Sequence, residues 1–206
     1  MRAVLLVAVL LVGLAVLLIL RLVERAVVGP ARPITAPIPR VVGRVALVIL
    51  GLPVSRRGTP LKGRGAVVAN HASWLDIFVL NGQQNIWFVA KAEVAAWPFI
   101  GWLARATGTL FIRRDRREAT RQVALFQERL DMGHRLLFFP EGTSTDGMRV
   151  LPFKSTLFSA FLKPELASDL VIQPVSVAYI APPGADTRFY GWWGEMSLGP
   201  HLFKVL

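Results

Sequence analysis

From residue 66 onward, short apolar runs alternate with stretches of helical periodicity, and this alternation limits the possible folds most strongly. Strand-like runs occupy 66–69, 86–90, 109–113, 135–139 and 171–179. Helices are expected over 155–162 and over 116–132, where Val123, Phe126 and Leu130 share a face and Gly133 stands in a typical stop position. The pattern predicts an α/β fold, with a mixed sheet flanked by helices. Pro174 lacks an N–H, so the last run is expected at an edge or a bulge.

Residues 3–20 form a run of 18 residues without a charge. As a helix this run would be about 27 Å long, close to the hydrocarbon thickness of a bilayer. A cleaved signal peptide is the alternative, but its apolar core is usually shorter and no small-residue cleavage site precedes the arginines. Arginine is denser after the run than before it, which predicts a single-pass anchor in the inner membrane with the body of the protein on the cytoplasmic face.

Charge and composition support a membrane-bound protein. The chain is 53% hydrophobic, has a net charge of +11 and contains no cysteine, which excludes disulfides, thiolate zinc sites and a cysteine nucleophile. Residues 1–75 carry nine arginines and Lys62 against Glu24, a net charge of +9, so only +2 remains for the rest. A basic half beside apolar sequence indicates anionic lipid headgroups more than nucleic acid.

Three parts are expected along the chain: a transmembrane anchor at 1–28, a linker at 29–65 and the α/β domain at 66–206. Four prolines at 29–39 predict a linker and not a helix. The apolar segment 45–54 is too short to span a bilayer, so it either lies in the membrane interface, re-enters the membrane, or packs on the domain as a helix. The chain stops abruptly after residue 206, and truncation of a last strand or helix stays an open alternative.

Asp76 follows His71 by five residues, directly after the first predicted strand. On one continuous helix five residues turn about 500°, so the two side chains would not share a face. The spacing fits if His71 lies in the strand-to-helix turn and Asp76 lies in the first turns of the helix. The carboxylate can then fix the imidazole tautomer and leave one nitrogen free to take a proton, which suits activation of a substrate hydroxyl. A surface histidine between two capping residues is the structural alternative.

Polar groups also follow two other predicted strands, and such groups gather at the carboxyl edge of a parallel sheet. Arg113 or Arg114 could hold a phosphorylated substrate, because a guanidinium matches phosphate oxygens. A solvated helix start is the alternative there. The turn at 141–144 combines an acid, a glycine and two hydroxyl side chains, which suits an anionic substrate. Glu141 could fix a substrate hydroxyl or simply cap the turn.

Four stretches together resemble the four ordered blocks of the glycerolipid acyltransferases, over about 66–179. They are Asn-His-x-x-x-x-Asp at 70–76, Gly-Thr-Leu-Phe-Ile-Arg-Arg at 108–114, Phe-Pro-Glu-Gly-Thr at 139–143, and Val-Ile-Gln-Pro-Val at 171–175. The first and third blocks are highly specific in combination. The bacterial 1-acylglycerol-3-phosphate acyltransferase branch is the closest resemblance.

The resemblance implies a glycerol-phosphate acyltransferase-like fold, in which 66–206 is the catalytic domain. It implies transfer of a fatty acyl group from acyl-CoA or acyl carrier protein to a lysolipid hydroxyl, giving phosphatidic acid when the acceptor is 1-acyl-sn-glycerol-3-phosphate. His71 would be the general base and Asp76 its partner, without a metal or a further cofactor. The residues implied in substrate binding are Asn70, Ser73, Lys91, Arg113, Arg114, Glu141, Gly142, Thr143 and Lys154.

Two departures from the family pattern concern the acceptor. Arg113 stands where the family commonly has Asp, and Ser144 stands where it often has Arg. The tail at 189–201 resembles the branch that O-acylates lyso-ornithine lipid, an acceptor with a carboxylate and no phosphate. Lyso-ornithine lipid is therefore the alternative acceptor. Trp192 and Trp193 in this tail would lie at the membrane interface or pack in the domain.

Two other classes of function compete with acyl transfer. A lipid hydrolase could use the same His–Asp pair, but it would need a serine nucleophile, and no Gly-x-Ser-x-Gly turn is present. A non-catalytic membrane-surface protein with a basic face would not depend on His71.

Overall fold

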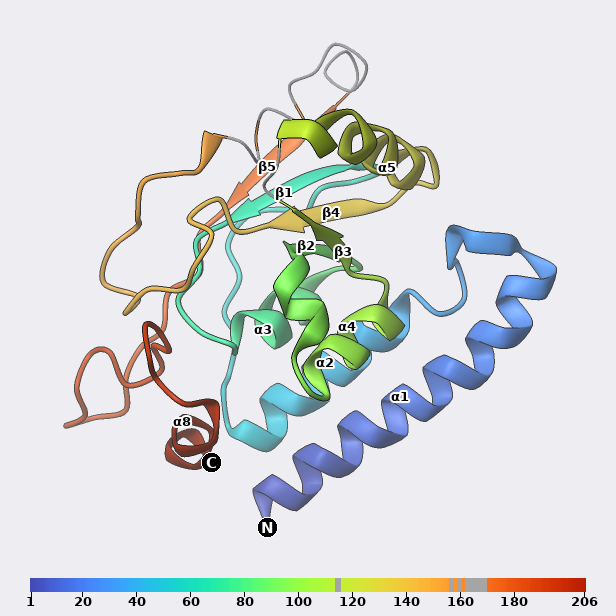
Figure 1. Ribbon diagram of the computed structural model, residues 1–206. Coiled ribbons are helices and arrows are strands. Elements are labelled where there is room, and N and C mark those ends of the chain that lie inside the picture. Colours follow the sequence, from blue (N-terminus) through green and yellow to red (C-terminus); the bar gives the residue numbers. More distant parts are fainter. Residues whose placement is uncertain (114–115, 156–157, 159–160, 162–169) are drawn as a thin grey trace.

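The computed structural model describes all residues except 114–115, 156–157, 159–160 and 162–169. Its centre is a five-stranded sheet in the order β3-β2-β4-β1-β5 (Figure 1). The strands are Gly65–Ala69 (β1), Trp87–Lys91 (β2), Leu110–Ile112 (β3), Arg135–Phe138 (β4) and Ile172–Val175 (β5). The predicted α/β sheet flanked by helices is confirmed. The described strands pair in parallel, however, where a mixed sheet was predicted, because helical crossovers return the chain to the same edge.

β1 is buried on both faces, which explains its uninterrupted apolar sequence. Ala66 and Val68 point toward α5 (Ala119–Asp131) and pack in one cluster with Phe126. The alternate residues of β1 pack in a second cluster with Leu80 of α3 (Asp76–Gln83), on the other side of the sheet. Figure 1 shows α5 above the sheet and α3 below it.

Two sequence predictions about element ends are confirmed. β5 pairs only with β1 among the described strands, so Pro174 lies in an edge strand as expected. The predicted helix at 116–132 is a 3-10 turn, Arg116–Glu118 (η3), followed by α5, and Gly133 beyond it has a φ of +79°. The helix predicted at 155–162 lies largely outside the described residues.

The predicted linker contains a helix whose first half, 37–44, the sequence analysis did not predict. After α1 (Arg2–Val27) and a 3-10 turn at Gly29–Ala31 (η1), α2 (Pro37–Leu50) begins at a proline. Prolines are tolerated in a first helical turn because the N–H groups there have no intrahelical acceptor. α2 packs between α1 and α3 and buries Ala46 and Leu50. The packed-helix alternative therefore holds for residues 45–50.

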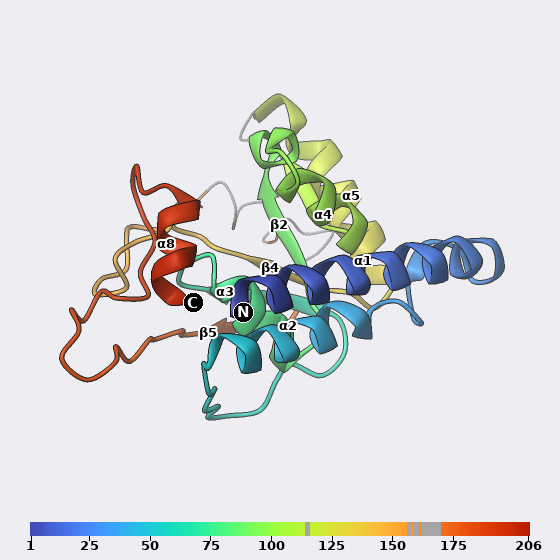
Figure 2. The same ribbon diagram turned by 90° about the horizontal axis from the view of Figure 1, so that it is seen from below.

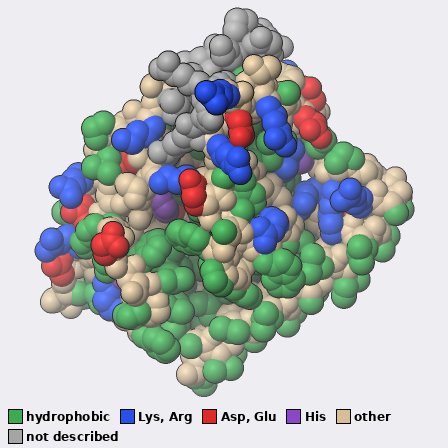
Figure 3. All heavy atoms as spheres, viewed as in Figure 1, with side chains coloured by type: hydrophobic (Ala, Val, Ile, Leu, Met, Phe, Trp, Pro, Cys, Tyr) green, Lys and Arg blue, Asp and Glu red, His purple; other side chains and the backbone are tan. Residues whose placement is uncertain are grey.

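α1 runs alongside α2 beneath the sheet (Figure 2) and is attached at both ends. The buried carboxylate of Glu24 accepts hydrogen bonds from the backbone N–H groups of Ile34 and Thr35 at 2.6 and 3.0 Å. At the other end, Arg2 donates to the carbonyl of Leu206 at 3.2 Å. Figure 3 shows hydrophobic side chains along the lower face, where most of α1 lies, and charged side chains over the upper half and at the left and right edges.

The remaining helices are short. A 3-10 helix, Ala92–Ala96 (η2), and α4 (Ile100–Thr107) connect β2 to β3, and α8 (Leu198–Val205) lies near the C-terminus. The η2–α4 segment exposes Trp97, Phe99 and Trp102. Its aromatic residues extend the apolar face of α1.

Candidate active site

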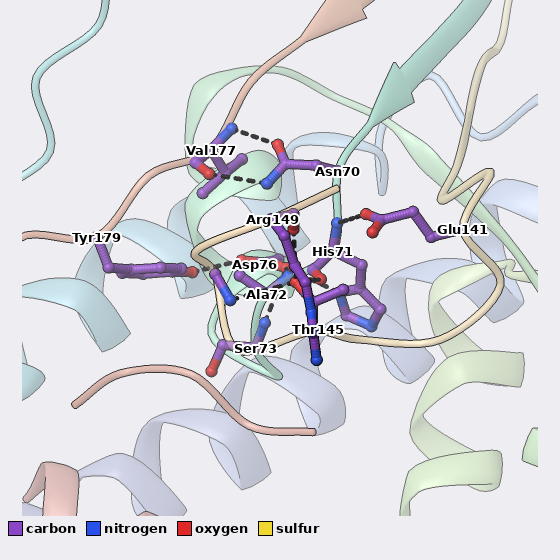
Figure 4. A network of polar contacts seen from close by, with 11 residues as sticks. Asn70, His71, Ala72, Ser73, Asp76, Glu141, Thr145, Arg149, Val177 and Tyr179 are labelled. Atoms are coloured by element: carbon purple, nitrogen blue, oxygen red, sulfur yellow. Dashed lines mark hydrogen bonds and ion pairs between the residues drawn. The ribbon is translucent and has the colours of Figure 1, made fainter. Parts of the chain in front are cut away.

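His71 lies just beyond β1, and its backbone is held on both sides by the loop that follows β4 (Figure 4). Its N–H donates to Oε1 of Glu141 at 2.7 Å, and its carbonyl accepts from the N–H of Thr145 at 2.8 Å. β4 is the direct neighbour of β1 in the sheet, so the two strands end side by side. Gly142 in this loop has a φ of +73°, a conformation that favours glycine.

Asp76 is the first residue of α3 and is completely buried. Its Oδ2 lies 2.7 Å from Nδ1 of His71 and accepts two backbone N–H groups, from Ala72 at 2.8 Å and Ser73 at 3.1 Å. Its Oδ1 accepts the phenol hydroxyl of Tyr179 at 2.5 Å. The predicted placement, with histidine in the turn and aspartate in the first helical turn, is therefore confirmed.

The His71 imidazole also stacks on the ring of Phe139, with ring centroids 4.0 Å apart. Since a carboxylate can only accept, Nδ1 carries the proton and Nε2 carries the lone pair. Nε2 has no hydrogen-bond partner among the described residues, and His71 lines a large cavity. The imidazole is therefore oriented to take a proton from a molecule in that cavity.

The cavity has a volume of about 750 Å³ and is mainly apolar. α1 contributes Leu6, Leu10 and Leu14 to one wall, and α4 with its preceding segment contributes Trp97 and Leu103 to another. His71 lines the cavity together with Gly142, Thr143 and Ser144 of the loop after β4. The apolar N-terminal helix thus forms part of the same cavity as the candidate base.

Three residues predicted to bind substrate have other roles in the structure. Ser73 is fully buried, and its backbone N–H donates to Oδ2 of Asp76. The amide of Asn70 bonds both backbone groups of Val177, at 2.9 and 2.7 Å. Both carboxylate oxygens of Glu141 accept backbone N–H groups, from His71 and Leu151, at 2.7 Å each. The side chains of Asn70 and Glu141 thus hold the loops around His71, whereas the hydroxyl of Ser73 is buried without a hydrogen-bond partner among the described residues.

Of the other predicted residues, Lys91, Gly142 and Thr143 line the cavity. Lys154 is exposed, and its N–H donates to the carbonyl of Pro140 at 2.8 Å. Arg113 lies in a separate hollow of about 270 Å³ together with Arg121, and pairs with Glu118 at 3.6 Å. β3 is three strand spacings from β1, roughly 14 Å, which explains the separation. Arg114 lies outside the described residues.

The structure adds residues to the site that the sequence analysis did not select. Tyr179 was only the end of a predicted strand, and no local pattern linked it to Asp76. Trp192 lines the cavity, and its backbone N–H donates to the carbonyl of Ala72 at 2.9 Å. Arg149 follows the Glu141 turn; its carbonyl and that of His71 accept from the same hydroxyl, that of Thr145, at 3.1 and 3.2 Å.

A second histidine, His134, is held very differently. It stacks on Trp87 with centroids 3.7 Å apart, its Nδ1 accepts from Nε of Arg129 at 2.7 Å, and its Nε2 donates to the carbonyl of Ala31 at 2.8 Å. Burial and, to a smaller extent, the nearby guanidinium of Arg129 lower the pKa of His134 to about 4, although the Ala31 bond opposes the shift. This ring stays neutral near pH 7 and has no nitrogen to offer a substrate.

Comparison with known proteins connects this geometry to a family. The family model for acyltransferases matches residues 53–178, which is more than half of the chain. The chain belongs to the acyltransferase family. It is 60% identical over 198 residues to a lyso-ornithine lipid O-acyltransferase of Rhodobacter capsulatus, with 96% of this chain and 72% of that protein covered.

More distant acyltransferases match as well. A 1-acyl-sn-glycerol-3-phosphate acyltransferase of Neisseria gonorrhoeae is 36% identical over 119 residues, with 57% of this chain and 47% of that protein covered. The chain therefore spans between about half and three quarters of these two relatives. The crystal structure of the 1-acyl-sn-glycerophosphate (LPA) acyltransferase of Thermotoga maritima has the same fold, with a TM-score of 0.53 and 23% identity over 79% of this chain and 71% of that one.

Proposed function

We propose that this acyltransferase moves a fatty acyl group from a thioester to the free hydroxyl of a lysolipid. The observation that carries the proposal is an imidazole that is oriented by a buried carboxylate and lines a large, mainly apolar cavity. A cavity of this kind accommodates alkyl chains, and a few polar groups in its wall orient the reacting part of the ligand.

The chemistry follows from the orientation of His71. Nε2 takes the proton of the acceptor hydroxyl while the oxygen attacks the thioester carbonyl. The tetrahedral intermediate then collapses, the carbon–sulfur bond breaks, and the imidazolium returns its proton to the departing thiolate. Asp76 stabilises the imidazolium in between, because its carboxyl group accepts a hydrogen bond from Nδ1 at 2.7 Å. General base catalysis of this kind typically contributes about 10²- to 10⁴-fold in rate.

For the acceptor we favour lyso-ornithine lipid over 1-acyl-sn-glycerol-3-phosphate. The relatives from Rhodobacter capsulatus and Rhizobium meliloti, 60% and 37% identical, are lyso-ornithine lipid O-acyltransferases. Arg149 is the side chain we assign to the carboxylate of this acceptor. It is exposed, its backbone is linked to that of His71 through Thr145, and its nearest described anion, Asp146, is 3.9 Å away. A guanidinium paired so loosely is available to an incoming carboxylate.

The donor in this proposal is an acyl thioester of coenzyme A or of acyl carrier protein. The test uses purified protein, each labelled donor in turn, and lyso-ornithine lipid or 1-acyl-sn-glycerol-3-phosphate. We expect diacylated product from lyso-ornithine lipid at the higher kcat/KM, and none above background from His71→Ala. Free fatty acid released from a lipid without acyl transfer would indicate a hydrolase. Lipid binding that His71→Ala leaves unchanged, without product from the wild type, would indicate a binding protein.

α1 is long and apolar enough to cross a membrane by length and composition. We propose that it is the anchor of the protein in the inner membrane, with the catalytic cavity facing the cytoplasmic side. Because α1 also forms a wall of the cavity, a lysolipid could enter from the bilayer directly. The chain has no cysteine, so Ser55→Cys supplies a single probe in an exposed loop. A membrane-impermeant maleimide should label it only after the membrane is opened, and labelling of intact spheroplasts would contradict the orientation.

A further inference from the structure

Tyr179 reaches the active site from a segment that is fixed by backbone contacts. It lies four residues beyond the end of β5, which pairs with β1. Between them, Asn70 bonds both backbone groups of Val177 and so continues the contact between the two strands past their ends. Figure 4 shows the tyrosine ring extending from this segment toward Asp76. The position of the Tyr179 ring is therefore set at the carboxyl ends of β1 and β5, where His71 also lies.

The phenol completes the hydrogen bonding of a buried carboxylate. Oδ2 of Asp76 already faces His71 and two backbone N–H groups, whereas the described partner of Oδ1 is Tyr179 alone, at 2.5 Å. Burial and the adjacent Asp76 carboxylate raise the pKa of the Tyr179 phenol above its usual value, so the hydroxyl remains a donor. Without it, Oδ1 would be a buried charged oxygen without a partner, and the carboxylate could turn about its Cβ–Cγ bond.

We infer that Tyr179 is a positioning residue of the catalytic His71–Asp76 pair, which it controls by fixing the carboxylate and sharing its charge. The inference rests on the proposed acyl transfer. A strong donor on Oδ1 makes the carboxylate a weaker base and limits how firmly it stabilises the imidazolium. Removing the donor makes the carboxylate a stronger base and stabilises the imidazolium further. The pair then stays protonated, and therefore inactive, to higher pH.

The test compares Tyr179→Phe with Tyr190→Phe, which removes the hydroxyl from a neighbouring ring whose centroid is 5.8 Å away. We expect Tyr179→Phe to lower kcat roughly threefold to tenfold and to move the acid limb of the kcat/KM–pH profile up by about 0.5 to 1 pH unit. Tyr190→Phe should leave the limb in place. A merely structural role would lower the thermal midpoint without moving the limb. Identical limbs in the two variants would overturn the inference.

A second measurement keeps the hydroxyl of Tyr179 and changes only its acidity. Tyr179 and Tyr190 are the only tyrosines in the sequence, so growth of Tyr190→Phe on 3-fluorotyrosine places one fluorinated phenol at position 179. A more acidic phenol is a stronger donor, so the acid limb should move to lower pH, opposite to Tyr179→Phe. The ¹⁹F resonance should also shift on Asp76→Asn and not on Asp186→Asn.

The two arms separate the possible failures. If the wild type transfers no acyl group to any lysolipid, the proposed function is wrong, and the ¹⁹F signal still decides whether the phenol senses Asp76. If the wild type is active and the fluorine signal ignores Asp76→Asn, the role of Tyr179 is wrong while the acyltransferase proposal stands.

Discussion

His71 and His134 stack on aromatic rings in nearly the same way, yet their surroundings give them opposite chemistry. The ring of His71 is 19% exposed and faces a carboxylate, whereas His134 is 2% exposed and faces the guanidinium of Arg129. One nitrogen of His71 opens on the cavity, but both nitrogens of His134 are bonded. Stacking and burial therefore do not make a base; an anionic partner and a free nitrogen do.

The difference between the two histidines should be reduced most strongly by removing the anionic partner of His71. Asp76→Asn should lower kcat by about 10²- to 10⁴-fold, because an amide does not stabilise the imidazolium and can select the wrong tautomer. Steady-state assays with a labelled acyl thioester measure this effect. The control is Asp186→Asn, an exposed carboxylate bonded to Arg188, which should stay within twofold. A folded Asp76→Asn variant with nearly full activity would show that the pair is not the base.

The surroundings of His134 predict a stability effect in place of an activity effect. Its pKa is lowered from 6.5 to about 4 in the folded protein, so the unfolded chain binds more protons between these values. Stability is therefore lost as pH falls through this window, by up to about 3 kcal/mol for the full shift. Urea unfolding followed by circular dichroism should show a steeper loss from pH 7 to pH 4 for the wild type than for His134→Gln. Equal slopes would contradict the assigned environment.

The apolar wall of the cavity can be tested separately from His71. Ala104→Phe, on the α4 wall, should reduce kcat/KM for long acyl chains about tenfold and affect short chains less, since it occupies space in an apolar pocket. Competition between donors of different chain length measures this ratio. Trp102→Phe on the same helix lies outside the cavity lining and should not change the ratio. An equal loss for all chain lengths would mean that the cavity does not hold the acyl chain.

The smallest effect is expected at the headgroup. Arg149→Ala should raise KM for lyso-ornithine lipid roughly threefold to tenfold with little change in kcat, because an exposed ion pair contributes only modestly. Arg149→Lys should be intermediate, since it keeps the charge and loses the planar fork. Arg188→Ala, which removes an exposed arginine paired with Asp186, is the matched control. An unchanged KM in Arg149→Ala would assign the acceptor carboxylate elsewhere.

The parts of the fold that the sequence predicted are those that local patterns determine. The strands, α5 and the His71–Asp76 geometry follow from periodicity and from the spacing of two residues. The sheet order does not, and it decides which loops meet. β4 and β5 flank β1, so Glu141 reaches His71 and Tyr179 reaches Asp76, while Arg113 at the end of β3 reaches neither. The first half of α2 was not predicted because its prolines were interpreted as helix breakers, although they lie in its first turn.

A comparison of variants at the two histidines in a single assay tests the central claim most directly. Acyl transfer from a labelled thioester to lyso-ornithine lipid would be measured near pH 7.5 for His71→Ala and His134→Gln, with circular dichroism to confirm the fold of each. We predict that His71→Ala loses at least about 100-fold of kcat and that His134→Gln stays within about threefold of the wild type. A folded His71→Ala enzyme that retains most of its activity would contradict the assignment of His71 as the base.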